Sequence, residues 1–304
     1  MAVHEHYRRQ VALLIRILPL VAEEQVFALK GGTAINLFVR DLPRLSVDID
    51  LTYLPVAGRP ESLAGIDTAM KRIAERIKVG LPASGVQEAA LEDENAVYKL
   101  FVMEGDLQVK IEVTPVARGC VYEPALRTVS ARVEEEFGFA ENQVVSFADL
   151  YAGKLVAALD RQHPRDLFDV RDLLASEGID DTLRTAFVIY ILGHNRPMEE
   201  VLGPTRKDIR KEFERGFSGM TEIPVTPDDL VEAREQLIAD IVGNMPEAHK
   251  ALLVSFVTGT PDWTLIDVPH AAELPAVRWR QVNLDQLGPN RRKALVNNLI
   301  AALQ

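Results

Sequence analysis

Two aspartates, Asp48 and Asp50, stand two residues apart in the segment SVDIDL. Side chains at this spacing leave a β-strand on the same face, so the two carboxylates lie together, and Ile49 between them points the other way. Two ionised carboxylates this close repel each other unless a cation lies near both. Oxygen ligands at this spacing suit Mg²⁺ or Mn²⁺. Asp48 and Asp50 are therefore candidate metal ligands and catalytic residues.

A glycine pair precedes this strand. Gly31, Gly32 and Thr33 follow a short apolar run, and Ser46 shares the face of the two aspartates. Glycine lets the backbone approach a ligand closely, and amides at a helix start attract anions. Each feature alone is typical of an ordinary turn or an edge strand. A phosphate-binding turn before a two-carboxylate metal site, in this order, favours phosphoryl or nucleotidyl transfer.

A third carboxylate, Glu112, falls on another predicted strand. Residues 98–103 and 107–113 predict a hairpin around Glu104-Gly105-Asp106, and Glu112 lies on the polar face of its second strand. The glycine pair and the two aspartates resemble the motifs of DNA polymerase β-type nucleotidyltransferases, which bring a third carboxylate from such a strand, and this resemblance makes Glu112 a candidate metal ligand. An ordinary solvent-exposed strand glutamate is the equally weighted alternative.

A second group of charged residues lies on helices later in the chain. Lys154 follows Gly153 in one predicted helix, and Pro164 begins another that carries Arg165, Asp166 and Asp169. Asp166 is placed to complement the helix dipole. Asp169 lies deeper, among apolar residues. Lysine and aspartate on amphipathic helices are most often surface residues, so this spacing alone leaves both interpretations open.

Gly-Gly-Thr, then about fifteen residues, then Asp-x-Asp resembles the signature of DNA polymerase β-type nucleotidyltransferases. With Lys154 and the RDLFD segment around Asp169, the chain more narrowly resembles the AbiEii/AbiGii toxins of bacterial toxin–antitoxin systems. The resemblance implies that Asp48 is the first catalytic acid and that Lys154 contacts nucleotide phosphates. It also implies that Asp169 is required for activity.

Composition sets further bounds. The chain has 304 residues, a formal net charge of −11 and one cysteine, Cys120, which fits a reducing cytosol. No apolar run approaches the roughly 20 residues of a membrane span, and the start lacks the apolar segment of a secretory signal. We therefore expect a cytoplasmic protein with no membrane partner. The acidic balance argues mildly against a generic polyanion binder.

The expected fold class is α+β. Residues 1–145 are predicted to form a polymerase β-like nucleotidyltransferase domain with a small mixed sheet, and residues 146–304 a mainly α-helical domain that completes the active-site cleft.

The leading hypothesis is a metal-dependent nucleotidyltransferase that uses a nucleoside triphosphate (NTP). Gly31, Gly32, Thr33 and Ser46 would line the phosphates, and Lys154 with Arg165 would neutralise them. The resemblance implies a toxin that acts on RNA, with transfer RNA 3′ ends as one acceptor, and a cognate antitoxin. The alternatives are transfer to a protein hydroxyl, or a catalytically idle nucleotide-binding regulatory module.

Overall fold

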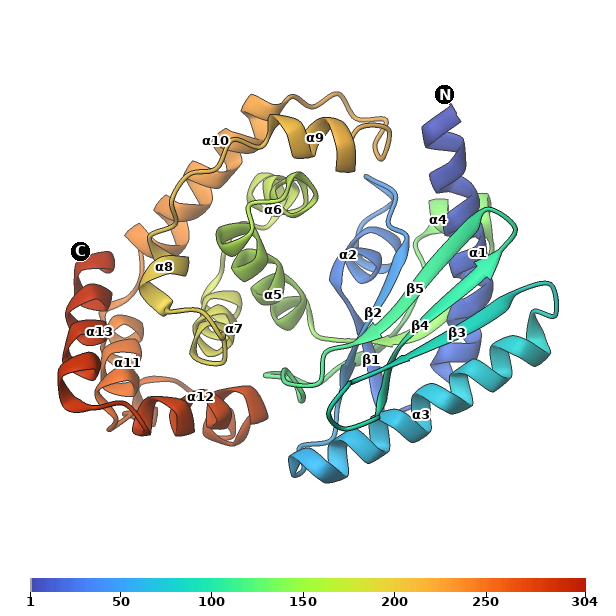
Figure 1. Cartoon of the computed structure of the whole chain (residues 1–304). Helices are drawn as coiled ribbons and strands as arrows, with labels where there is room; N and C mark the ends of the chain where they lie inside the picture. The colour runs from blue at the N-terminus through green and yellow to red at the C-terminus, as the bar shows by residue number, and fades with distance from the viewer. Residues whose placement is uncertain (1) are drawn as a thin grey trace. The chain divides into compact units, whose positions relative to one another are not determined.

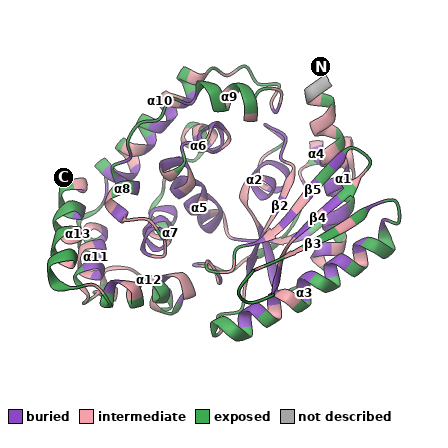
Figure 2. Cartoon of the chain, viewed as in Figure 1, coloured by how far each residue is buried: buried purple, intermediate pink, exposed green. Residues whose placement is uncertain are grey.

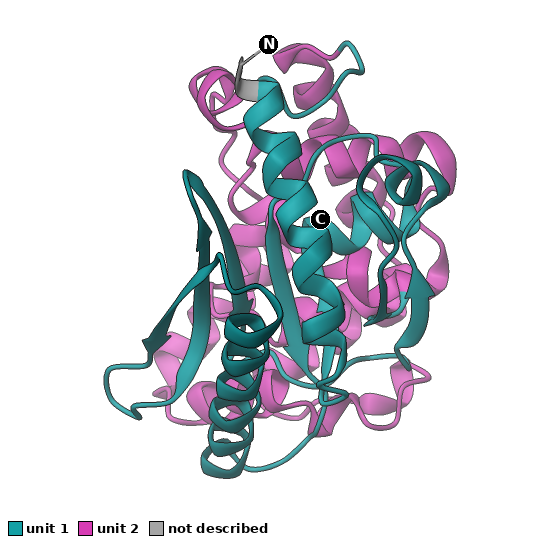
Figure 3. Ribbon diagram, turned by 90° about the vertical axis from the view of Figure 1, so that its right-hand side faces the viewer, with its two compact units in different colours: residues 1–146, 218–224 teal, residues 147–217, 225–304 magenta. Residues whose placement is uncertain are grey.

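The chain divides into two compact units (Figure 3). The computed structural model describes residues 2–304, with side chains from residue 4 onward. The first unit holds the residues up to Ser146 together with Ser218–Pro224, and the second holds Phe147–Phe217 and Val225–Gln304. The sequence prediction assigned everything after residue 145 to the helical domain, whereas the structure groups residues 218–224 with the first unit.

The first unit is built on one mixed sheet, as the α+β prediction requires (Figure 1). Its strands, within the described residues, are β1 Phe27–Lys30, β2 Asp48–Tyr53, β3 Gly85–Ala90, β4 Val97–Glu104, β5 Leu107–Val113, β6 Ala125–Thr128 and β7 Glu141–Val144. The spatial order is β3-β4-β5-β2-β1-β7-β6. The β2–β5 and β1–β7 pairs are parallel, and the others are antiparallel.

Alternation along β2 and β5 separates an apolar face from a charged one. Ile49 and Ile111 are fully buried and directly paired. The neighbours of each isoleucine along its strand, which include Asp50 and Glu112, are half-buried and face the other way. The candidate metal-binding carboxylates therefore lie on the sheet face opposite the packed apolar side chains.

Two long helices cover the apolar face. The helix α1, Ala2–Ala22, contacts β5 and β7, and α3, Arg59–Gly80, contacts β3 and β4. Leu14 and Leu18 of α1 and Ile66 and Ile73 of α3 are fully buried. A short helix, α4 Ala131–Phe137, precedes β7. After β1 the chain forms a helical turn, α2 Gly31–Thr33, that continues as the π-helix η1 Ala34–Val39.

The second unit is helical. Its helices are α5 Phe147–Asp160, α6 Pro164–Ser176, α7 Asp181–Leu192, α8 Met198–Leu202, α9 Arg210–Gly216, α10 Pro227–Ile238, α11 Glu247–Thr258, α12 Pro275–Asp285 and α13 Pro289–Ala302. Short turns, η2 Ala239–Gly243, η3 Trp263–Leu265 and η4 Ala271–Glu273, join some of them. The helix α5 packs against α6 and α7, and Figure 2 shows buried residues along all three.

Between residues 2 and 304, no helix combines the length and apolarity that crossing a membrane demands.

Candidate active site

The glycine turn at the end of β1 is shaped around the side chains beside it. Gly31 has a φ of +73°, and a Cβ at this position would lie 2.5 Å from Oδ2 of Asp50. A Cβ on Gly32 would lie 2.8 Å from Nη2 of Arg44 and 2.9 Å from Oγ of Ser46. No side chain fits at either position without displacing these groups. The backbone of the turn therefore directly contacts a carboxylate, a guanidinium and a hydroxyl.

Hydrogen bonds join this turn to the start of β2. The hydroxyls of Thr33 and Ser46 are 3.1 Å apart, and the Thr33 hydroxyl donates to the carbonyl of Asp48. The side chain of Asn36 donates to the carbonyl of Gly32 at 2.9 Å. These bonds fix the predicted phosphate-binding residues against the strand that carries the two aspartates.

The charged face of the sheet alternates in sign across its strands. Asp48 lies opposite Lys110 of β5, and Asp50 lies between Lys30 of β1 and Glu112 of β5. Opposite residues in adjacent strands project to the same face. The structure thus brings Asp48, Asp50 and Glu112 onto one face, as the sequence predicted, and adds lysines that the prediction did not include.

Glu112 is held by two lysines. Its carboxylate is 2.8 Å from Nζ of Lys110 and 3.0 Å from Nζ of Lys99 on β4. Burial raises the pKa of Glu112, but the hydrogen bonds and charges of these lysines outweigh it, and the pKa lies below its ordinary value. Burial lowers the pKa of Lys30, and the charges of Asp50, Cys120 and Glu112 oppose this shift.

The carboxylates of this face are oxygen donors of the kind that bind a divalent metal. Among residues 2–304, no three or more His, Cys, Asp or Glu side chains are grouped closely enough to hold a metal ion. Mg²⁺ commonly binds through one or two carboxylates together with substrate phosphates. Asp48 and Asp50 beside the glycine turn fit that requirement. Glu112, which is engaged by Lys99 and Lys110, is not grouped with them as a third ligand.

In the second unit, Lys154 of α5 is the centre of a buried charge cluster. Its Nζ lies 2.8 Å from Oδ1 of Asp166 and 3.0 Å from Oδ2 of Asp169, both on α6. The side chain of Lys154 is 6% exposed, and those of Asp166 and Asp169 are 2% and 1% exposed. Spacing of three residues places both aspartates on the same face of α6. All three are therefore buried, which the sequence suggested only for Asp169.

Arg161, in the loop between α5 and α6, completes the cluster. Its Nε and Nη2 donate to Asp166 at 2.5 and 3.0 Å, and its own side chain is 63% exposed. Burial raises the pKa of Asp166, but the charges of Lys154 and Arg161 outweigh it and hold this pKa far below its ordinary range. Two cations and two anions leave the cluster electrically balanced.

Arg165, the other predicted phosphate contact, lies in the first turn of α6. Its backbone N–H donates to Nδ1 of His163, which caps the helix, and its side chain is half-buried. The structure gives no contact between its guanidinium and the Lys154 cluster. Its predicted role remains a prediction.

The sequence interpretation missed Arg44, Arg161 and the two lysines that hold Glu112. One signal was available for Arg44. Arg44, Ser46, Asp48 and Asp50 follow one another at steps of two, which is the spacing of residues on one face of an extended segment. Arg161 has no such signal, because its contact depends on how the loop between α5 and α6 folds.

Residues 12–280 match the family described as nucleotidyl transferase AbiEii toxin of type IV toxin–antitoxin systems. The chain belongs to this family. The resemblance to the AbiEii toxins and the predicted enzyme class, a nucleotidyltransferase, are thus confirmed. Membership in a family of type IV toxins implies a cognate antitoxin and a nucleotide substrate.

A solved structure agrees with this assignment. MenT4, a nucleotidyltransferase toxin from Mycobacterium tuberculosis, matches with a TM-score of 0.64 over 100% of this chain and 96% of that chain, at 14% identity. At this identity the match shows the fold alone. No curated protein matches the chain in sequence.

Proposed function

We propose that this AbiEii-family toxin transfers a nucleotidyl group from an NTP to a hydroxyl of an RNA acceptor, with transfer RNA 3′ ends as one candidate. The acceptor oxygen forms a new bond to the α-phosphorus, the bond between the α-phosphorus and the bridging oxygen breaks, and pyrophosphate leaves. The hydroxyl proton passes to a nearby carboxylate or to water. The contact between the Gly31 backbone and the Asp50 carboxylate carries this proposal, because it unites a phosphate-binding turn with the metal-binding acids.

The glycine turn, the two aspartates and the lysines around Glu112 would each contribute to this reaction. The amides of Gly31 and Gly32, with the hydroxyls of Thr33 and Ser46, would bind phosphate oxygens. Asp48 and Asp50 would hold Mg²⁺ or Mn²⁺, which when bound supplies positive charge to the phosphates and the departing pyrophosphate. The lysines around Glu112 keep this face from accumulating net negative charge before the nucleotide arrives.

The Lys154 cluster would serve the same reaction. Asp169 lies 3.0 Å from the Lys154 ammonium, which supports a role in positioning that amine for phosphate contact. An Asp169→Asn variant would then keep its fold but bind NTP more weakly. A variant that folds normally and retains full NTP affinity and activity would remove Asp169 from the functional site.

Labelling distinguishes the possible reactions. Purified protein with Mg²⁺ would be incubated with total RNA and cell protein, using either α- or γ-labelled NTPs. Nucleotidyl transfer to RNA predicts α-label on RNA and no γ-label on any acceptor. Label confined to protein would favour transfer to a protein hydroxyl instead, and γ-label on an acceptor would show phosphoryl transfer.

Matched variants connect this activity to the site. Asp48→Asn should abolish labelling and should also remove thermal stabilisation by Mg²⁺ with NTP. Asp93→Asn, which changes an exposed loop aspartate, should alter neither. Stabilisation of the wild type without any labelled acceptor would support the regulatory nucleotide-binding module. Full activity in Asp48→Asn would refute the proposed site.

A further inference from the structure

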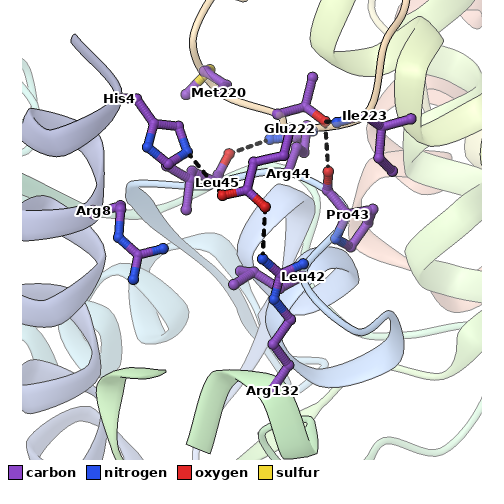
Figure 4. Close-up of a pocket in the computed structure, with 11 residues that line it drawn as sticks. His4, Arg8, Leu42, Pro43, Arg44, Leu45, Arg132, Met220, Glu222 and Ile223 are labelled. Carbon is purple, nitrogen blue, oxygen red and sulfur yellow. Dashed lines mark hydrogen bonds and ion pairs between the residues drawn. The ribbon is translucent and has the colours of Figure 1, made fainter. Parts of the chain in front are cut away.

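Residues 218–224, called here the return segment, lie between α9 and α10 but belong to the first unit. Figure 4 shows them beside the loop before β2. The carbonyl of Met220 accepts a hydrogen bond from the backbone N–H of Leu45 at 2.6 Å. The hydroxyl of Thr221 donates to the carbonyl of Pro43 at 2.8 Å. The return segment therefore holds the loop at positions 43 and 45.

Charged contacts hold the return segment from its other side. Glu222 accepts from Nη2 of Arg132 at 3.0 Å and lies 3.8 Å from Nε2 of His4. Arg132 also binds Glu136, which in turn binds Arg8 of α1. A small pocket opens among these side chains (Figure 4). The network ties the return segment to α1 and α4, both of which pack in the first unit.

Arg44 connects this loop to the glycine turn. It is 3% exposed, and its Nη1 donates to the carbonyl of Leu45 at 3.0 Å. Its Nη2 and the hydroxyl of Ser46 both lie within 3 Å of the position that a Cβ on Gly32 would occupy. The bonds from the return segment thus flank Arg44, which itself packs against the phosphate-binding backbone.

We propose that the return segment is a latch that sets the geometry of the NTP phosphate site. In this proposal Thr221 is a positioning residue: it fixes the loop from Pro43 to Leu45, which holds Arg44 and Ser46 against the Gly31–Gly32 turn. The inference rests on the proposed function, because it assigns the glycine turn to NTP phosphates. It assigns to nucleotide binding a segment more than 170 residues further along the chain.

The test uses Thr221→Val, which keeps the shape of the side chain but removes the hydroxyl. This hydroxyl also accepts from the N–H of Ile223 at 3.0 Å, so two hydrogen bonds are lost. The expected result is an increase in the KM and in the dissociation constant (Kd) for Mg²⁺-bound ATP, CTP, GTP or UTP by about 5- to 30-fold, with kcat within about 2-fold. Thr221→Ser should restore both values. Glu214→Gln, on the exposed surface of α9, serves as the control.

Hydrogen exchange measured by mass spectrometry tests the latch without any nucleotide. Thr221→Val should increase deuterium uptake at residues 42–46, and Thr221→Ser should not. Wild-type uptake at these residues in Thr221→Val would overturn the latch, as would raised uptake with unchanged NTP affinity. A wild-type protein that binds none of the four nucleotides would refute the proposed function. The exchange measurement uses no nucleotide, so its result tests the latch separately from the proposed function.

Discussion

Substituting Lys154 with methionine would leave the carboxylates of Asp166 and Asp169 buried without the ammonium that contacts both. Methionine nearly preserves the volume of the side chain, so the loss is electrostatic. Removal of one partner from a buried ion pair typically costs about 3–5 kcal/mol. Arg161 still binds Asp166 in this variant, which favours the lower end of that range. We expect a loss of about 3 kcal/mol in the unfolding free energy at pH 8.

The dependence on pH identifies the cause. In the wild type the folded-state pKa of Asp166 is depressed, so its stabilisation is fully present above the unfolded pKa of about 3.9 and is lost only as pH falls through the folded value. In Lys154→Met one carboxylate should instead have a raised pKa in the folded state. At about 1.4 kcal/mol per pKa unit, a loss of about 3 kcal/mol corresponds to a rise of roughly two pKa units from the depressed wild-type value. The deficit should therefore shrink as pH falls through the raised folded-state pKa.

Tryptophan fluorescence during urea unfolding reports on the second unit, which contains Lys154. Both tryptophans, Trp263 and Trp279, lie in the second unit, and Trp263 packs edge-on against Phe256. The double variant Lys154→Met, Asp169→Asn should recover part of the loss at pH 8. A deficit under about 1 kcal/mol, or one that does not shrink on acidification from pH 8 to about pH 3, would refute the reasoning.

Two further predictions concern the first unit. Gly31→Ala should abolish labelling of the acceptor, because its Cβ would displace Asp50, whereas Gly105→Ala, with a similar φ of +61° and open space around it, should lose only stability, by about 1–2 kcal/mol. Activity in Gly31→Ala equal to that in Gly105→Ala would contradict this. Glu112→Gln should reduce the acid sensitivity of unfolding below about pH 4.5, measured by far-ultraviolet circular dichroism, because the depressed pKa of Glu112 gives stability that is lost on acidification. Identical acid transitions in the variant and the wild type would exclude that role.

Elements with a strong periodic pattern were predictable from the sequence. Apolar alternation identified β2 and the β4–β5 hairpin, and the apolar stripes of α1 and α3 are equally regular in the sequence. Alternation also placed Asp48, Asp50 and Glu112 on one face, because register follows from the burial of the other face.

Elements without their own pattern were missed. Residues 115–143 have no regular apolar pattern, yet they contain β6, α4 and the start of β7. All four residues of β6 are exposed, so no apolar alternation marks it, and β7 is defined by its pairing with β1 rather than by composition. The assignment of residues 218–224 to the first unit was also missed.

The charge partners of the candidate site were the least predictable part. The family resemblance singled out Lys154 and Asp169, but the ion pairs of Lys154 with both aspartates, and of Arg161 with Asp166, depend on the packing of α6 against α5. Likewise, Lys99 reaches Glu112 only through the antiparallel β4–β5 register. Each residue of such a network, taken alone, has the sequence pattern of an ordinary surface residue on a helix or strand, so the network cannot be predicted from local sequence.

The return segment also has a consequence for synthesis on the ribosome. When Ser146 has been translated, every strand of the sheet exists, but the chain that bonds to Pro43 and Leu45 does not. Translation at about 5–20 residues per second delays that segment by roughly 4 to 16 s. A nascent or prematurely ended chain that stops between Ser146 and Met220 therefore has every strand of the sheet but an unsecured loop. Messages cut short between these two codons would yield products that lack this part of the toxin's fold.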